Sequence, residues 1–173
     1  MKGPLKKLNS AILKLKSRAF FNLPASKKEI ANFEKNINFS LTNDLREFYS
    51  SYNGGFFADS LWNITDIQDK EKYNLIKWNS NHFLKLTEII EHFENIETLL
   101  EIEMGENRNI KYFPFLQTKD QELFVIRFSL NDNNNSVHKL VRQTPSHYWN
   151  LINDNFEHFL NNYVEKFGNI LPY

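Results

Sequence analysis

Residues 24–55 read PASKKEIANFEKNINFSLTNDLREFYSSYNGG, and this stretch decides the fold. Ser26 followed by Glu29 is the capping-box pattern, in which each side chain bonds the backbone amide of the other residue at a helix start. Apolar residues then recur at helical spacing as far as Ile37. A polar break at residues 40–43 follows, so this part predicts one short amphipathic helix.

A second amphipathic helix is expected after the break. Its apolar residues repeat at helical spacing: Leu41, Leu45, Phe48, Tyr49 and Tyr52. Asn53, Gly54 and Gly55 follow, and these residue types tolerate the left-handed backbone that ends many helices. A phosphate-binding loop is the weaker interpretation, because such loops precede a helix and this triplet follows one. We therefore expect the triplet to stop the second helix.

Strand patterns dominate the rest of the chain. We expect strands around residues 61–64, 100–104, 110–116, 122–130 and 137–142. A helix from about residue 84 should end near Asn95, because Glu97 would fall on its apolar side; a helix that continues to Glu101 is the alternative. The last helix is expected over about residues 148–167, before Gly168.

Two residues mark irregular points of the expected sheet. Pro114 has no amide hydrogen to donate, so its strand should lie at an edge or carry a bulge. Asp120 falls in the turn before the most regular strand pattern. Helices on either side of antiparallel strands predict an α+β fold: an antiparallel β-sheet of about 4–6 strands flanked by N-terminal helices and a C-terminal helix.

Length and composition favour one domain over residues 1–173. Residues 1–22 predict an amphipathic helix packed on that domain; a helix for a membrane surface or a partner is the alternative. The 16 Phe, 7 Tyr and 3 Trp supply ample core material. Cysteine is absent, which excludes disulfides, Cys-ligated zinc and thiol catalysis.

Charge is balanced overall but divided along the chain. Lys+Arg and Asp+Glu both number 21, so bulk attraction to nucleic acid is not expected. Residues 1–28 contain basic residues and no acid, whereas residues 88–106 contain glutamates and no Lys or Arg. Lys14 and Lys16 interrupt what would be a signal-peptide core, and no apolar run reaches the roughly 18 residues of a membrane span. We expect a cytoplasmic protein that binds no membrane.

Three segments resemble the Smi1/Knr4 family, also called the SUKH superfamily, in the family's order. They are residues 24–55, residues 112–128 with FPF, Asp120 and LFVIRF, and residues 148–163 with FEHFL where the family shows Phe-x-x-Phe-Leu. The chain lacks the family's usual Leu-Pro before the second helix and its glycines after Asp120. The resemblance implies a SUKH-like fold without enzymatic chemistry. It also implies either an immunity protein that neutralises a toxin, as in bacteria, or a scaffold, as in fungi.

No combination of residues in the sequence predicts catalysis. The five histidines show no i, i+3 or i, i+4 pair of the kind that binds a metal on a helix. Asp120 and Glu122 resemble a paired-carboxylate site, but acids are common in turns. Arg108, Lys111 and Tyr112 form only a thin basic–aromatic patch. We expect no enzyme, no metal, no cofactor and no direct nucleic-acid binding.

We therefore expect a protein-binding module, most simply an immunity protein that binds a cognate protein toxin, of which a nuclease domain is one candidate. Carboxylates steer toward and pair with the cationic cleft of such an enzyme. The candidate partner-binding residues are Glu88, Glu91, Glu94, Glu101, Glu103, Trp62 and Trp78. The two tryptophans, with Trp149 as a third, are candidates only if their side chains are exposed. An ordinary solvated helix face is the alternative reading of these acids, and a scaffold or regulatory interaction domain is the alternative function. The sequence does not indicate an oligomeric state.

Overall fold

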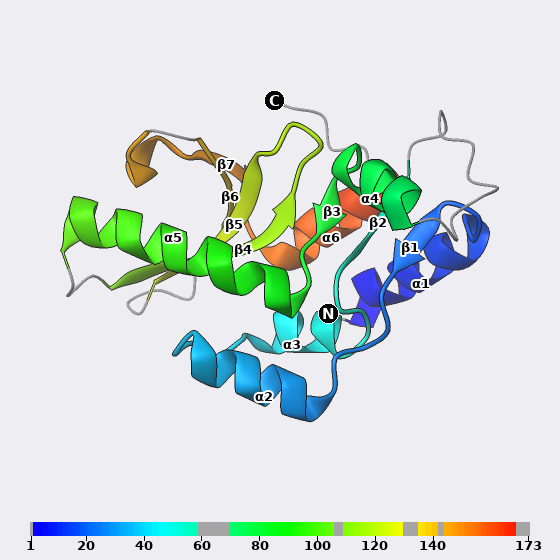
Figure 1. The fold of residues 1–173 in the computed structure, drawn as a ribbon, viewed down its shortest axis with the longest axis horizontal. Helices are drawn as coiled ribbons and strands as arrows, with labels where there is room; N and C mark the ends of the chain where they lie inside the picture. The colour runs from blue at the N-terminus through cyan, green and yellow to red at the C-terminus, as the bar shows by residue number, and fades with distance from the viewer. Residues whose placement is uncertain (1, 59–69, 106–108, 130–134, 142–143, 169–173) are drawn as a thin grey trace.

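The computed structural model describes residues 2–58, 70–105, 109–129, 135–141 and 144–168 (Figure 1). The helices of this part of the chain are α1 (Lys2–Lys14), α2 (Lys27–Asn36), α3 (Asn43–Tyr49), α4 (Lys70–Trp78), α5 (Leu86–Met104), α6 (Phe156–Glu165) and the 3-10 turn η1 (Ser146–Tyr148). None of the described helices is long and apolar enough to cross a membrane.

One antiparallel sheet runs through the molecule in chain order, from β1 to β7. Its strands are β1 (Ala19–Phe21), β2 (Gly55–Phe57), β3 (His82–Phe83), β4 (Ile110–Gln117), β5 (Leu123–Ser129), β6 (Val137–Leu140) and β7 (Asn150–Asn153). The expected α+β class is confirmed, with seven strands among the described residues where about four to six were predicted. The strand expected at residues 61–64 lies outside the described residues.

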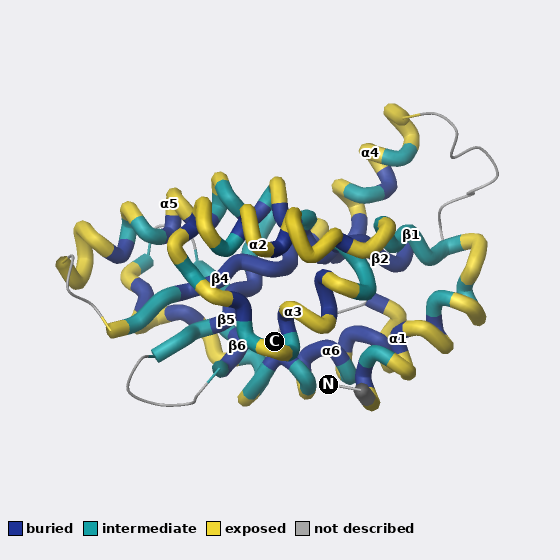
Figure 2. The backbone as a smooth tube through the Cα atoms, turned by 90° about the horizontal axis from the view of Figure 1, so that it is seen from below, coloured by how far each residue is buried: buried dark blue, intermediate teal, exposed yellow. Residues whose placement is uncertain are grey.

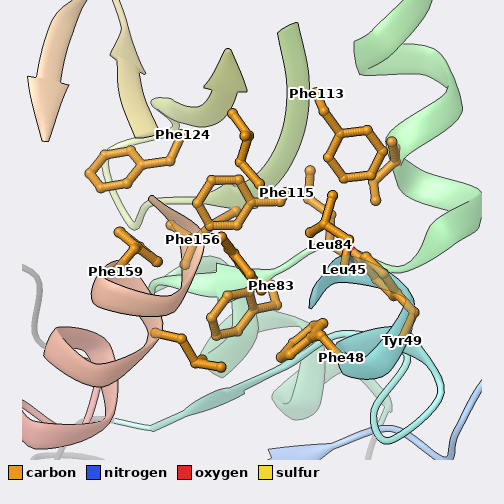
Figure 3. Packing of buried hydrophobic residues seen from close by; sticks show 14 of the residues in the cluster. Leu45, Phe48, Tyr49, Phe83, Leu84, Phe113, Phe115, Phe124, Phe156 and Phe159 are labelled. Carbon is orange, nitrogen blue, oxygen red and sulfur yellow. Dashed lines mark hydrogen bonds between the residues drawn. The ribbon is translucent and has the colours of Figure 1, made fainter. Parts of the chain in front are cut away.

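Aromatic side chains from helices and strands form the main core. Figure 3 shows Phe48 of α3, Phe83 of β3, Phe115 of β4 and Phe156 of α6 gathered around one centre. The ring centroids of Phe48 and Phe83 are 4.8 Å apart, and those of Phe115 and Phe156 are 5.3 Å apart. All four side chains are buried, so the helices on this side are fixed to the sheet by direct ring packing.

The capping box of α2 is confirmed. The Glu29 amide donates to Ser26 Oγ at 3.2 Å, and the Ser26 amide donates to Glu29 Oε2 at 2.8 Å. The following helix, α3, ends at Tyr49, before the Asn53 triplet. Gly54 and Gly55 instead form the turn into β2, with φ angles of 77° and 145°. The triplet therefore leads into a strand, of which Gly55 is the first residue, and the expectation that it stops the helix was wrong.

The N-terminal helix is shorter than the expected residues 1–22. It ends at Lys14, and β1 follows at Ala19–Phe21. Phe20 and Phe21 belong to this strand and not to the helix, and their rings pack against Phe56 and Phe57 of the neighbouring strand β2. Leu8 of α1 is fully buried in the main core, and the helix lies against α6 (Figure 1).

The helix α5 is continuous through Met104, which corrects both the expected end near Asn95 and the expected strand at residues 100–104. Ile96 and Leu100 continue its apolar face and pack in a second core cluster with Tyr112, Val125 and Trp149. The alternation of apolar residues that suggested a strand is misleading, because Ile102 is 80% exposed.

The last helix also begins later than expected. Residues 148–155 contain the end of η1 and the strand β7, and α6 starts at Phe156. Asn155 caps that helix, since its Oδ1 accepts a hydrogen bond from the His158 amide at 2.9 Å. Leu151 pairs with His138 in the sheet, so this segment extends the ladder by one strand.

Pro114 lies in a central strand, between β3 and β5, and not at an edge. The pairing of β4 with β5 shifts register between Pro114 and Leu116, which confirms the bulge that was the other predicted possibility. The helix α4 was not expected, because its sequence combines charged residues with only a short apolar pattern.

Candidate partner-binding surface

An acidic stripe runs along one side of α5, a helix in which exposed and buried residues alternate (Figure 2). Glu91, Glu94 and Glu101 are exposed and share one helical face with Thr87 and Thr98. The opposite face is buried against the sheet and the core helices. No Lys or Arg occurs between Leu86 and Met104, so the helix contains no basic side chain within the stripe.

Glu88 belongs to the same helix but has a structural role. Its Oε1 forms an ion pair with Lys77 Nζ of α4, and its Oε2 accepts a hydrogen bond from the Lys85 amide at 2.9 Å. Burial opposes ionisation of this carboxyl, yet the hydrogen bonds and the Lys77 charge outweigh burial and lower its pKa. Glu88 therefore anchors the N-terminal end of the stripe.

Glu103 ties the other end of α5 to η1. Its Oε2 accepts a hydrogen bond from the Ser146 amide at 3.0 Å. Glu101 and Glu103 stand in the last turn, where the helix dipole is negative and carboxylates cost roughly 0.3–1 kcal/mol each. The helix dipole alone therefore does not favour acids in this turn.

The tryptophan candidates within the described residues differ in exposure. Trp78 is 51% exposed at the end of α4, where its ring meets the edge of His82 at a centroid distance of 6.3 Å. Lys77, the residue before Trp78, forms an ion pair with Glu88 in the first turn of α5. Trp149 is 4% exposed and belongs to the second core cluster. Trp62 lies outside the described residues.

A groove of about 200 Å³ separates α2 from α5. Its lining combines polar and apolar side chains: Glu29, Asn32, Phe33, Asn36, Asn53, Leu86, Thr87 and Ile90. Asn53 fixes one end, since its Oδ1 accepts a hydrogen bond from the Leu86 amide at 3.0 Å. The i, i+3, i+4, i+7 spacing of the α2 residues is visible in the sequence, but their pairing with α5 is not.

Comparison with known families gives a match to the family described as SMI1 / KNR4 family (SUKH-1), over residues 24–162. The chain belongs to this family. A search of curated proteins finds no match. The Smi1/Knr4 match begins just before α2 and ends within α6, so it includes the acidic stripe and the groove but not α1.

The Smi1/Knr4 domain places Asp120 in an exposed turn. Its neighbour Glu122 forms an ion pair with Lys139 Nζ at 3.0 Å. Among the described residues no three His, Asp or Glu side chains are grouped as metal ligands would be. The ion pair between Glu122 and Lys139 instead links the start of β5 to β6, where Leu123 faces Leu140.

One serine–histidine pair was not foreseen from the sequence. Ser136 Oγ and His138 Nε2 are 2.9 Å apart, and His138 Nδ1 lies 3.4 Å from the Trp149 carbonyl oxygen. Burial lowers the pKa of His138, with Arg127 acting in the same direction. Ser136 is 4% exposed, so its hydroxyl is a poor nucleophile for an external substrate. The pair fits a role in joining β6 to β7.

Proposed function

We propose that this Smi1/Knr4 domain is a non-catalytic protein-binding module that acts as an immunity protein. It binds a cognate protein toxin directly and blocks the toxin's active site or substrate access. The observation that carries the proposal is the acidic stripe of α5, which the helix displays without any basic residue of its own. Family membership supports the protein-binding role.

A nuclease toxin is the partner that this stripe fits best. An enzyme that binds phosphates presents Lys and Arg in its cleft, and a complementary acidic surface accelerates encounter and opposes wrong partners. Glu91 and Glu94 are the first two exposed glutamates of this stripe, and Trp78, which follows Lys77 in α4, supplies an exposed aromatic ring. An aromatic centre with charged surroundings is typical of tight interfaces. The protein acts in the cytoplasm and needs no cofactor.

The test is co-expression with a candidate toxin domain, sought among the genes next to this one, scored by survival, together with measured binding of the purified pair. The double charge reversal Glu91→Lys with Glu94→Lys should lower affinity at least tenfold, chiefly through slower association. The difference should shrink at high salt, because screening removes steering. Asp120→Lys with Asp154→Lys is the matched control, since both residues are exposed and the change in net charge is equal.

Each result separates the parts of the proposal. Unchanged affinity of the α5 double variant would exclude the acidic stripe as the contact surface while leaving neutralisation intact. Failure of the unaltered protein to bind the toxin or to protect cells would exclude the immunity role and leave the scaffold alternative.

A further inference from the structure

A basic groove lies between α1 and α6. It has a volume of about 410 Å³ and is lined by Lys6, Lys7, Ser10, Ala11, Lys14, Val164, Glu165 and Phe167. The apolar floor comes from the alanine, the valine and the phenylalanine. Lys14 Nζ lies 5.7 Å from the ring centroid of Phe167, and Lys7 Nζ is 3.3 Å from Glu165 Oε1. The groove therefore combines an apolar base with a cationic rim, of which Lys6 is an exposed member.

The last turn of α5 presents a surface of the opposite charge. This turn, residues 101–104, displays Glu101 beside Ile102 and Met104, which are 80% and 43% exposed. The hydrogen bond from the Ser146 amide to Glu103 holds η1 against this turn. We call residues 101–104 the acidic tip. It presents carboxylates together with apolar side chains that the described part of the chain leaves uncovered.

The groove and the tip lie at opposite ends of the molecule. Figures 1 and 2 share their horizontal axis, and both place α1 toward one end and the last turn of α5 toward the other. The tip of one copy therefore cannot reach the groove of the same copy. It can reach the groove of a neighbour.

We propose that the protein self-associates head to tail, with the acidic tip of one copy docked in the basic groove of the next. Ile102 and Met104 cover the apolar floor, and Glu101 pairs with the lysines of the rim. The chain itself supplies both halves of this charge complementarity: α1 contains no acid and α5 no base. Balanced charge, 21 basic against 21 acidic residues, removes the net repulsion that keeps many proteins apart.

The geometry sets the form of the assembly. Two different patches at opposite ends make a heterologous contact, which gives open chains, or rings where the rotation closes. One helix end in one groove buries less than the roughly 1,200 Å² of a stable interface, so the association is weak and depends on concentration. It does not depend on the proposed toxin binding, and it uses α1, which lies outside the family match.

Sedimentation velocity of the full chain over a range of concentrations tests this inference. The sedimentation coefficient should rise with concentration at low salt, and the rise should be reduced at about 1 M salt, where the screening length is about 3 Å. Glu101→Lys alone and Lys6→Glu alone should each remain monomeric, because a tip then meets a groove of like charge. An equimolar mixture of the two variants should associate again.

Controls keep the result specific. Glu94→Lys lies two turns before Glu101 on the same helix and Lys28→Glu is exposed on α2; they match the two changes in net charge and should associate like the unaltered protein. Ile102→Ser should weaken association at every salt concentration, and its exposed position leaves folding intact, as circular dichroism would verify. A monomer at all concentrations, or a mixture that stays monomeric, would overturn the proposal.

Discussion

Lys77 and Glu88 form an ion pair that joins the end of α4 to the first turn of α5. Their side chains are only 17% and 32% exposed, so the pair is better shielded from water than most surface salt bridges. The other carboxylate oxygen of Glu88 caps α5 through the Lys85 amide. One side chain thus fixes the position of α4, with Trp78, relative to the acidic stripe.

Replacing Glu88 by alanine should lower the free energy of unfolding by about 1–3 kcal/mol, because the cap and the partner of a half-buried ammonium are both lost. Glu91→Ala, on the exposed side of the same helix, should change it by less than about 0.5 kcal/mol. Urea titration followed by circular dichroism measures both. Equal effects of the two substitutions would contradict the anchoring role of Glu88.

His82 should make the protein less stable in mild acid. It is 2% exposed, and burial, helped by the charges of Lys77 and His92, lowers its pKa to about 4, although the Ser80 carbonyl and Glu88 oppose the shift. An unfolded histidine takes up its proton near pH 6.5. Between pH 6.5 and about 4 the unfolded chain alone gains this proton, so stability falls with decreasing pH by up to about 1.4 kcal/mol per unit.

Urea titrations at steps from pH 7.5 to 4.5 measure this slope. His82→Asn keeps a donor for the Ser80 carbonyl oxygen but does not titrate, so it should flatten the dependence. The slope should not vanish, since the pKa of His138 is lowered by burial as well. His158→Asn, at an exposed position of α6, is the control. An unchanged slope in His82→Asn would exclude His82 as its source.

Sequence patterns correctly predicted the features that depend only on residues close together in the chain. The Ser26–Glu29 capping box depends on two side chains and two amides within one turn, and it forms as predicted. The β4–β5 hairpin follows from long alternating patterns, and Pro114 marks its bulge. Such features need little help from distant residues, so short patterns suffice to predict them.

Tertiary contacts decided the elements that the sequence did not reveal. The strands β1 and β3 have three and two residues, too few for a period of two to be visible. Helix α5 extends past Asn95 because Ile96 and Leu100 pack on Tyr112 and Trp149. For the candidate site, composition revealed the glutamates, but only the fold separates Glu88 and Glu103, which bond backbone amides, from the exposed stripe.

Helices α2 and α3 offer a matched test of capping. Ser26 caps α2 with a side-chain hydrogen bond, whereas Thr42 precedes α3 without one. Ser26→Ala should therefore lower the free energy of unfolding by about 1 kcal/mol, and Thr42→Ala by clearly less. Thermal and urea unfolding of both variants measure the difference. A larger loss for Thr42→Ala would show that residue propensity, not the hydrogen bond, sets the cost at these positions.

Gly54 and Gly105 differ in the space around them, so alanine substitutions at the two positions test the cost of a steric clash. Both have positive φ angles, 77° and 79°, and Gly105, with ψ 174°, lies in a region that only glycine adopts readily, so alanine at either position should cost roughly 1–3 kcal/mol. A Cβ on Gly105 would meet nothing within 4 Å, but one on Gly54 would lie 2.7 Å from the Phe83 carbonyl oxygen. That oxygen belongs to β3, which pairs with β2 directly after Gly54, so it cannot move without disturbing the ladder. Gly54→Ala should therefore lose more stability than Gly105→Ala in urea titration. Equal losses would mean that β2 and β3 separate easily, and the close approach at Gly54 would then not hold the sheet together.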